Sequence, residues 1–244
     1  MKQYLELYKG ELLDQVIPFW ENNSLDKVNG GYFTCLDQYG KVYDTDKFVW
    51  LQARQIWMFA MLYEQVEPNE EWLKIAKSGA AFLIEHGRDE QGAFYFSLDQ
   101  KGKPLVQPYN IFSDCFAAMA FAALNKIEPN EEYATLAIKT FDNILERRDN
   151  PKGIYSKTFP GTRNLKSFAL PMILSNLTLE MGALLDDGKV SSLVPAVILE
   201  VMEVFLQKDS GLILENVNLD GSFSDSFEGR LTSPGHAIEA MWFM

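Results

Sequence analysis

The chain has 244 residues, of which 47% are hydrophobic and 23% are charged, so it is long enough to bury a core. Its 22 basic and 34 acidic residues give a net charge of −12, which argues against nucleic acid or an anionic membrane as a partner. Two cysteines far apart and two histidines make a His/Cys metal centre improbable, so we expect no metal. The N-terminus lacks an apolar signal core, and no run reaches the roughly 18 apolar residues of a membrane span, which predicts a soluble, cytoplasmic protein.

A repeat of about 60 residues organises the chain. In each copy a glycine opens a short apolar or aromatic run, and a second glycine follows about ten residues later in a turn. The first glycines are Gly31, Gly92, Gly153 and Gly211, and the second are Gly40, Gly102, Gly161 and Gly221. An apolar run, an Asp/Gly turn and a second run together predict a short hairpin or extended loop in every copy.

Helical patterns fill the segments between these loops. Glu67-Pro-Asn-Glu-Glu-Trp72 recurs as Glu128-Pro-Asn-Glu-Glu-Tyr133, and each copy offers an asparagine cap and an acidic first turn. Amphipathic helices alternate with far more apolar ones, as outer helices do when they cover buried inner helices. In chain order, we expect helices over residues 3–22, 49–64, 70–86, 111–125, 131–147, 166–184, 190–207 and from 235 onward.

Such helical pairs predict an all-α fold, an (α/α)6 toroid or barrel whose hairpin loops gather on one face. Function is expected on that face, because loops on a rigid scaffold commonly carry it. Six pairs of about 60 residues need about 360 residues. Residues 1–244 are therefore predicted to be a single partial barrel domain that lacks roughly its last third. An open four-pair solenoid is the alternative, although a solenoid normally ends in a polar cap.

The first candidate site lies on the inner helix expected over 49–64. Its motif is Trp50-Leu-Gln-Ala-Arg-Gln-Ile-Trp57, in which Arg54 and Trp57 share one face. A guanidinium fork suits the hydroxyls or an acyl oxygen of a sugar, and an indole suits the apolar face of its ring. The structural alternative is a salt bridge from Arg54 to a loop carboxylate, because an unpaired buried charge is costly.

The second candidate site is the stretch from Arg230 to Glu239. Ser233 can cap a new helix and Pro234 suits its first turn, which places His236 and Glu239 on one face. A carboxylate beside an imidazole can fix its tautomer, and this arrangement suits proton transfer near neutral pH. Arg230 could donate to a developing oxyanion. A satisfied structural histidine and a solvated loop arginine are the competing interpretations.

Several residues give weaker signals. His86 ends an expected outer helix, where a histidine complements the helix dipole without a catalytic role. Loop acids could supply the carboxylate pair of a glycosidase, but acids are plentiful in this chain. These acids are Asp44, Asp46, Asp225 and Glu228. No phosphate-loop, dinucleotide or serine-hydrolase motif is present.

From about residue 18 to its end, the chain resembles the N-acylglucosamine 2-epimerase family. The resemblance is carried by Phe19-Trp-Glu21, Gly30-Gly-Tyr-Phe33, Trp50-Leu-Gln-Ala-Arg-Gln-Ile-Trp-Met58, Ile111-Phe-Ser-Asp-Cys-Phe116 and Ser233-Pro-Gly-His-Ala-Ile-Glu-Ala240. It implies a six-pair α/α barrel and epimerisation at carbon 2 of a reducing sugar through an enediolate-like state. By resemblance, the catalytic residues are His236, Glu239 and Arg54, and the substrate-binding residues are Arg230, Trp57 and Trp50. In this picture Glu239 orients His236.

The resemblance also sets what is expected of the substrate. The family's second catalytic histidine lies beyond residue 244, so residues 1–244 alone are expected to be inactive. The segment Ala169-Leu-Pro-Met-Ile-Leu174 lacks the histidine that cellobiose 2-epimerases and sugar isomerases carry there. This favours N-acetylglucosamine and N-acetylmannosamine over the substrates of another 2-epimerase or of an aldose–ketose isomerase. A glycosidase on an α/α barrel and a non-catalytic binding protein are two competing hypotheses of different classes.

The resemblance implies an amino sugar as the ligand and no required cofactor. It allows ATP as an allosteric activator, although no nucleotide motif in the chain supports that role. A homodimer is compatible with it. Neither nucleic acid nor a membrane is expected as a partner.

Overall fold

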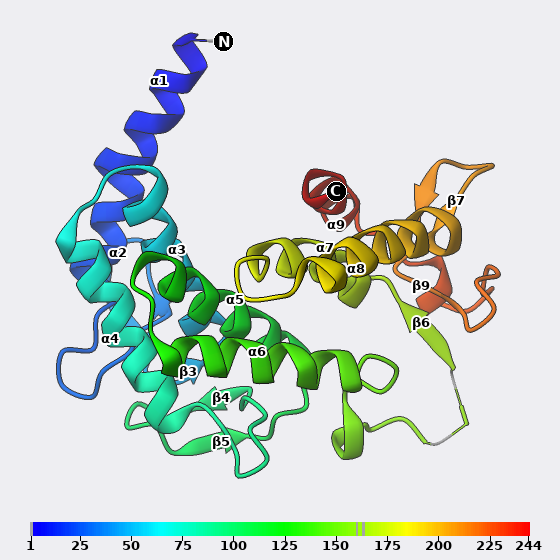
Figure 1. Ribbon diagram of the computed structural model, residues 1–244, viewed down its shortest axis with the longest axis horizontal. Coiled ribbons are helices and arrows are strands. Elements are labelled where there is room, and N and C mark those ends of the chain that lie inside the picture. The colour runs from blue at the N-terminus through cyan, green and yellow to red at the C-terminus, as the bar shows by residue number, and fades with distance from the viewer. Residues whose placement is uncertain (1, 160, 163) are drawn as a thin grey trace.

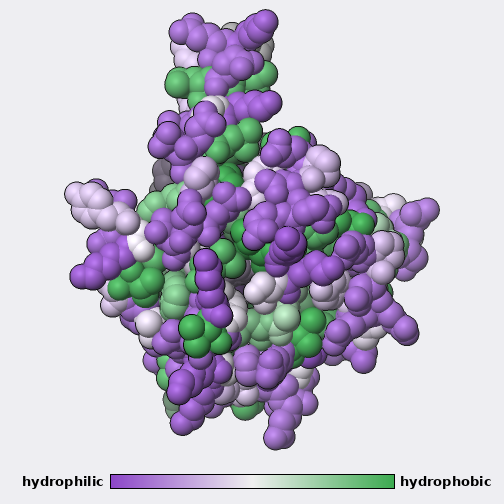
Figure 2. Space-filling model, turned by 90° about the vertical axis from the view of Figure 1, so that its left-hand side faces the viewer, coloured by the Kyte–Doolittle hydropathy of each residue, from purple (hydrophilic) through white to green (hydrophobic). Residues whose placement is uncertain are grey.

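The computed structural model describes residues 2–159, 161–162 and 164–244. Its first outer segment is α1 (Lys2–Glu11), which continues through a π-helical turn at Leu12–Val16 into α2 (Ile17–Asn23). The helix predicted over 3–22 is therefore confirmed, with an irregular middle turn. None of the residues of α1 is buried, and the helix projects from the body of the molecule (Figure 1). Figure 2 shows it standing above the body, with apolar side chains between polar ones.

The remaining helices alternate between an inner row and an outer row (Figure 1). The inner helices are α3 (Val49–Gln65), α5 (Ile111–Ile127), α7 (Ala169–Glu180) and α9 (Pro234–Phe243). The outer helices are α4 (Glu70–His86), α6 (Glu131–Glu146) and α8 (Asp187–Glu200), which ends in a π-helical turn at Val201–Phe205. Inner helices pack against one another along the row, and α3, α5 and α7 each pack against an outer helix. This is the α/α barrel architecture that the alternation predicted.

The repeated asparagines begin the outer helices as predicted. The side chain of Asn69 accepts a hydrogen bond from Glu71 N–H at 2.9 Å, and Asn130 accepts one from Glu132 N–H at 2.8 Å. These caps satisfy backbone donors that have no partner inside the helix. Asn110 caps the inner helix α5 in the same way.

The main core surrounds α5, the most deeply buried inner helix. Twelve of its 17 residues are buried, and many of these are alanines, which let the neighbouring helices approach closely. Large aromatic side chains such as Phe59, Phe121 and Phe141 fill the remaining space and are fully buried. A second, smaller cluster joins α7, the end of α8, the fourth-copy loop and α9. It consists of Phe168, Met172, Val201, Phe205, Leu214, Val217 and Ala240.

Short antiparallel strands lead into the inner helices. They are β1 (Cys35–Leu36), β2 (Val42–Asp44), β3 (Lys47–Phe48), β4 (Ser97–Leu98), β5 (Pro104–Val106), β6 (Leu165–Ser167), β7 (Leu206–Gln207), β8 (Leu212–Ile213) and β9 (Asn216–Asn218). The hairpins predicted in the first and second copies form as β1–β2 and β4–β5. Gly40 and Gly102 sit in the turns of these two with φ of 84° and 90°, which a glycine adopts without strain. In the fourth copy the prediction is wrong in register: β7 and β8 pair across the turn that ends at Gly211, and the turn at Gly221 follows β9, which pairs with β6.

The hairpin predicted in the third copy is not local. A 3₁₀ turn forms at Gly153–Tyr155, and β6 pairs with β9 of the fourth copy instead. This pairing occupies residues 165–167, which were predicted to be helical from 166, so α7 begins only at Ala169. Strand β3 likewise pairs with β4 of the next copy. The first copy is therefore joined to the second, and the third to the fourth, by backbone hydrogen bonds as well as by helix packing.

Besides the β3–β4 pairing, a buried lysine connects the first two copies through hydrogen bonds, and we call this group of contacts the Lys47 joint. The Nζ of Lys47 donates to Asp26 Oδ2 at 3.0 Å, to the Gly30 carbonyl at 2.5 Å and to the Gln100 carbonyl at 2.8 Å. All three ammonium donors are thus satisfied, and the side chain is fully buried. Burial alone would raise the pKa of Asp26, but hydrogen bonds from Asn29, Lys47 and Val28 outweigh it and lower the pKa to about 2.

Candidate functional site

The first group of candidate residues lies where α3 meets α5. The guanidinium carbon of Arg54 stands 4.8 Å from the centroid of the Phe116 ring, and the Trp50 ring lies 6.1 Å from the same ring. Arg54 is exposed, and within the described ranges it forms no salt bridge. The alternative of a structural salt bridge is therefore not what the structure contains. An arginine stacked on an aromatic ring keeps its N–H donors available for a ligand.

Arg54 and Trp57 share one face of α3, as their spacing predicted, and both line a pocket of about 320 Å³. Its lining residues are Trp20, Thr34, Leu51, Arg54, Gln55, Trp57 and Met58. Trp57 Nε1 donates to Glu180 Oε2 at the end of α7, at 3.2 Å, which fixes the indole plane. The buried Thr34 hydroxyl has no hydrogen-bond partner among the described residues. A cation, a free hydroxyl and an apolar plate are therefore close together.

The second group lies at the start of α9. The Ser233 hydroxyl accepts a hydrogen bond from His236 N–H at 3.4 Å, and Pro234 occupies the first helical turn, so the predicted helix start is confirmed. His236 is held in the first turn with its side chain 45% exposed. Its ring is not in the environment of a satisfied core histidine.

A carboxylate holds the His236 ring, and it comes from Glu215. The Nδ1 of His236 lies 3.0 Å from one carboxylate oxygen of Glu215 and 3.1 Å from the other. The expectation that Glu239 orients His236 is therefore corrected. Glu239 shares the helical face but forms no hydrogen bond or ion pair with any described residue. Glu215 lies between β8 and β9 and reaches the ring from outside the helix.

Arg230 is positioned by a 3₁₀ turn at Glu228–Arg230, and the Asn216 amide donates to the Glu228 carbonyl at 3.1 Å. Its guanidinium pairs with Asp225 Oδ1 at 2.8 Å, and both side chains are more than half exposed. This is the setting of a solvated loop arginine. No hydrogen bond or ion pair within the described ranges joins Arg230 to His236.

The two groups stand at opposite ends of the row of inner helices. Arg54, Trp50 and Trp57 lie on α3, His236 lies on α9, and α5 and α7 separate them (Figure 1). In the described part of the chain, no direct polar contact joins one group to the other.

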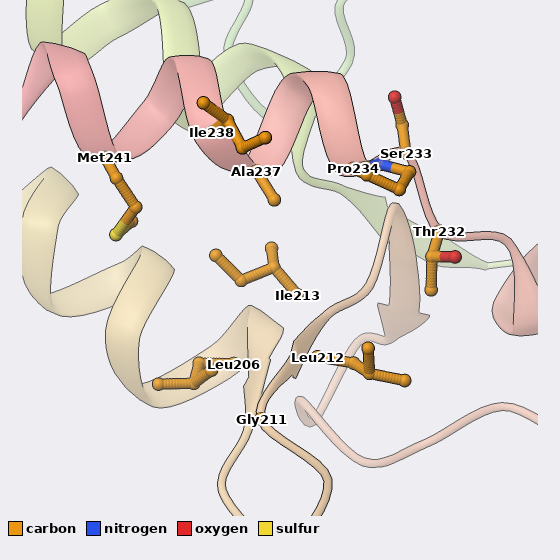
Figure 3. A pocket seen from close by; sticks show the side chains of 10 residues that line it. All are labelled: Leu206, Gly211, Leu212, Ile213, Thr232, Ser233, Pro234, Ala237, Ile238 and Met241. Carbon is orange, nitrogen blue, oxygen red and sulfur yellow. The ribbon is translucent and has the colours of Figure 1, made fainter.

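An apolar groove of about 480 Å³ runs between α9 and the β7–β8 hairpin. Figure 3 shows Ala237, Ile238 and Met241 of α9 on one side of it and Leu206 and Ile213 on the other. None of its ten lining residues is ionisable, so the groove cannot carry proton transfer. The ionisable groups near it are the neighbouring His236 and Glu215.

The weaker candidate residues make contacts that are common in protein structures and that imply no catalytic role. His86 is the last residue of α4, and its ring packs 5.0 Å from that of Phe82, as expected of a structural histidine. Asp225 is engaged by Arg230. The pKa of Asp46 is raised by partial burial and by the charges of Asp44 and Asp99. The Asp44 carboxylate accepts the Asp46 N–H at 3.0 Å, which is a common turn contact.

Sequence reasoning missed three residues of these groups: Glu215, Phe116 and Thr34. The available signal for Glu215 is an acid directly after the apolar run Gly211-Leu-Ile-Leu, where the loop returns toward an inner helix. Phe116 closes the motif that begins at Ile111, but its spacing does not indicate a contact with Arg54. No local pattern marks Thr34.

The family model for N-acylglucosamine 2-epimerase (GlcNAc 2-epimerase) matches residues 31–244. The chain belongs to the N-acylglucosamine 2-epimerase family. The N-acylglucosamine 2-epimerase of Rattus norvegicus is 36% identical over 253 residues, which cover 100% of this chain and 60% of the rat protein. The human N-acylglucosamine 2-epimerase is 34% identical, over 96% of this chain and 56% of its own length. This family member thus spans less than two thirds of these curated relatives.

Solved structures agree on the fold of this N-acylglucosamine 2-epimerase family member. Cellobiose 2-epimerase from Bacillus thermoamylovorans superposes with a TM-score of 0.85 at 21% identity, over 100% of this chain and 66% of its own. A D-mannose isomerase superposes with a TM-score of 0.72 at 18% identity, over 92% of this chain and 57% of its own. No helix in the described ranges is both long and apolar enough to cross a membrane.

Proposed function

We propose that the intact protein interconverts N-acyl-D-glucosamine and N-acyl-D-mannosamine by moving the proton on carbon 2 of the open-chain sugar. The observation that carries this proposal is the His236–Glu215 pair at the start of α9. An imidazole held through Nδ1 presents the lone pair of Nε2 as a general base. The family and the curated relatives supply the sugar class.

The first step is proton abstraction by His236 Nε2. As the bond between carbon 2 and its hydrogen breaks, its electron pair forms the double bond between carbons 1 and 2, and negative charge develops on the aldehyde oxygen. Arg54 is suited to stabilise that charge, because its N–H groups have no acidic partner among the described residues. Return of a proton to the opposite face of carbon 2 completes the inversion.

The pocket beside Arg54 fits a sugar chain. Trp57 lines the pocket and offers an apolar plate for the carbon-bound hydrogens, and Trp50, beside Phe116, is assigned a second such plate. Arg230 is assigned to the substrate as a donor that exchanges its surface partner Asp225 for a sugar oxygen. Glu239 stays assigned to the catalytic group, facing the substrate rather than orienting His236.

Inversion needs a second acid/base group on the other side of carbon 2. We assign it to the chain beyond residue 244, so residues 1–244 alone are expected to give no turnover. The reaction needs no bound cofactor, because the aldehyde itself accepts the electron pair. ATP as an activator, a homodimer and a cytoplasmic location complete the proposal. Rates with and without ATP test the first, and light scattering tests the second.

The test is proton exchange at carbon 2. The intact gene product that carries residues 1–244 is incubated with N-acetylmannosamine in deuterium oxide, and the carbon 2 proton signal is followed by NMR. We expect loss of that signal and formation of N-acetylglucosamine, with both abolished in His236→Ala. Exchange that survives His236→Ala refutes the assignment. Release of reducing ends from a disaccharide without exchange favours a glycosidase, and saturable sugar binding without turnover favours a binding protein.

A further inference from the structure

Glu215 contacts His236 in a way that selects one of its ring nitrogens. Both carboxylate oxygens lie at nearly equal distances from Nδ1, 3.0 and 3.1 Å. An ionised carboxylate can only accept hydrogen bonds, so Nδ1 must donate, and the proton of the neutral ring resides on Nδ1. Nε2 then holds the lone pair, and no described residue forms a hydrogen bond with it.

The backbone holds Glu215 from two sides. Its N–H donates to the Leu231 carbonyl at 3.1 Å, and its carbonyl accepts from the N–H of Phe168, the residue before α7, at 2.9 Å. The next residues form β9, which pairs with β6. The carboxylate is thereby fixed relative to the segment that leads into α9. This support does not involve the side chain, so a substitution of Glu215 leaves it in place.

Burial separates the roles of the two side chains. The Glu215 side chain is 16% exposed, whereas the His236 side chain is 45% exposed. The carboxylate is therefore the more buried partner, and the ring is the more accessible one. Among the described residues the carboxylate forms hydrogen bonds only with His236. It acts on the reaction through His236 alone.

We infer that Glu215 is the positioning residue of His236: it fixes the Nδ1–H tautomer and stabilises the imidazolium formed when Nε2 takes the carbon 2 proton. This inference rests on the proposed epimerase function and deepens it. The proton moves from carbon 2 to Nε2, while the Nδ1 proton stays on the ring and its hydrogen bond to Glu215 becomes charge-assisted. Glu239 has no share in this positioning.

The first measurement is the tautomer of His236. Long-range ¹H–¹⁵N correlation spectra of the intact protein distinguish the two neutral forms, and the His236 signal is the one lost in His236→Asn. We expect Nδ1–H in the wild type and in Glu239→Gln, and a shift toward Nε2–H in Glu215→Gln. An unchanged tautomer in Glu215→Gln, or a changed one in Glu239→Gln, overturns the inference.

The second measurement is the rate of carbon 2 exchange. In Glu215→Gln we expect kcat to fall roughly 10²- to 10⁴-fold with little change in KM, by analogy with loss of the orienting carboxylate of a catalytic triad. Glu215→Asp keeps the charge and should recover part of the rate. Asp209→Asn, an exposed acid in the same copy with no described partner, is the matched control and should keep the wild-type rate.

The two proposals fail separately. Wild-type kcat in both Glu215 variants, with full wild-type exchange, refutes the positioning role and leaves the epimerase standing. Absence of exchange in the wild type refutes the epimerase, while the tautomer spectra still decide whether Glu215 sets the state of His236. Melting temperatures within a few degrees of the wild type show that lost rate is not lost fold. If Glu215→Gln does not fold, Glu215→Asp carries both measurements.

Discussion

Substitution of Lys47 by methionine tests the joint between the first two copies. The change removes the ammonium but keeps much of the side-chain volume, so it leaves the Asp26 carboxylate buried without its cation. Breaking a buried ion pair from one side costs about 3–5 kcal/mol. Asp26 keeps its hydrogen bonds from Val28 N–H and Asn29 N–H, both at 3.0 Å. We therefore expect a loss at the lower end, about 3 kcal/mol.

The loss is measured as the change in the free energy of unfolding in urea at neutral pH, followed by circular dichroism. Lys77→Met is the matched control, because Lys77 pairs with Glu128 at 2.6 Å but both side chains are about half exposed. Exposed pairs contribute about 0–1 kcal/mol. A loss in Lys47→Met no larger than in Lys77→Met refutes the reasoning that burial makes this pair matter.

The Asp26 carboxylate, which pairs with Lys47, also makes the free energy of unfolding depend on pH. The pKa of Asp26 falls from 3.8 to about 2 on folding, which corresponds to about 2–3 kcal/mol of stability. Because the folded pKa is the lower one, this stability is present above about pH 4 and is lost as the pH falls toward 2. Asp26→Asn should remove that acid-sensitive part. A wild-type and a variant curve that run parallel between pH 4 and 2 would contradict it.

Three further predictions concern the helix ends and the core. Ser233→Ala removes the cap of α9 and should cost about 0.5–1 kcal/mol in urea unfolding, because the 3.4 Å bond is long; an unchanged midpoint contradicts the cap. Gly102→Ala should lower the free energy of unfolding more than Gly92→Ala. Both glycines have φ near 90°, so the backbone strain is the same in the two variants. A Cβ at Gly102 would lie 2.3 Å from the His86 ring, whereas one at Gly92 would meet nothing within 4 Å. Equal losses would refute the steric part. Burial raises the pKa of Asp114 to about 6, so the folded state gains a proton as the pH falls from 6 to 4. The wild type should gain stability over Asp114→Asn in that window, by about 3 kcal/mol at most; a constant difference contradicts it.

Much of the fold is predictable because its signals are local. Asn69 and Asn130 each cap a helix that begins at the next residue, so a short stretch of sequence suffices to place its start. The Asp/Gly turns of the first two hairpins are equally local, since Asp99 Oδ1 accepts from Lys101 N–H and Lys103 N–H within the same turn. Periodic apolar positions then separate inner from outer helices.

The third-copy loop was not predictable for the opposite reason. Its strand β6 finds a partner about 50 residues later in β9, and short strands of three residues carry no sequence mark of such a pairing. The candidate site likewise combines features set by local sequence with contacts between distant residues. The start of α9 follows from the local capping chemistry of Ser233 and Pro234. The partner of His236 is Glu215, 21 residues earlier in the chain, and no local pattern links the two residues. Helical spacing pointed to Glu239, but spacing gives only the face and not the direction of the side chain.

The strand pairing between copies has a consequence for how this array unfolds. In a simple helical array each unit is stabilised only by packing against its neighbours, so a single unit can open locally. Here the Phe168 N–H of the third copy bonds the Glu215 carbonyl of the fourth. Opening of the fourth unit must therefore break the β6–β9 hydrogen bonds as well as a packed surface. Local opening of the segment before α7 would break the Phe168–Glu215 hydrogen bond and free Glu215, the partner of His236. The environment of His236 in the fourth copy therefore depends on the folding of the third copy.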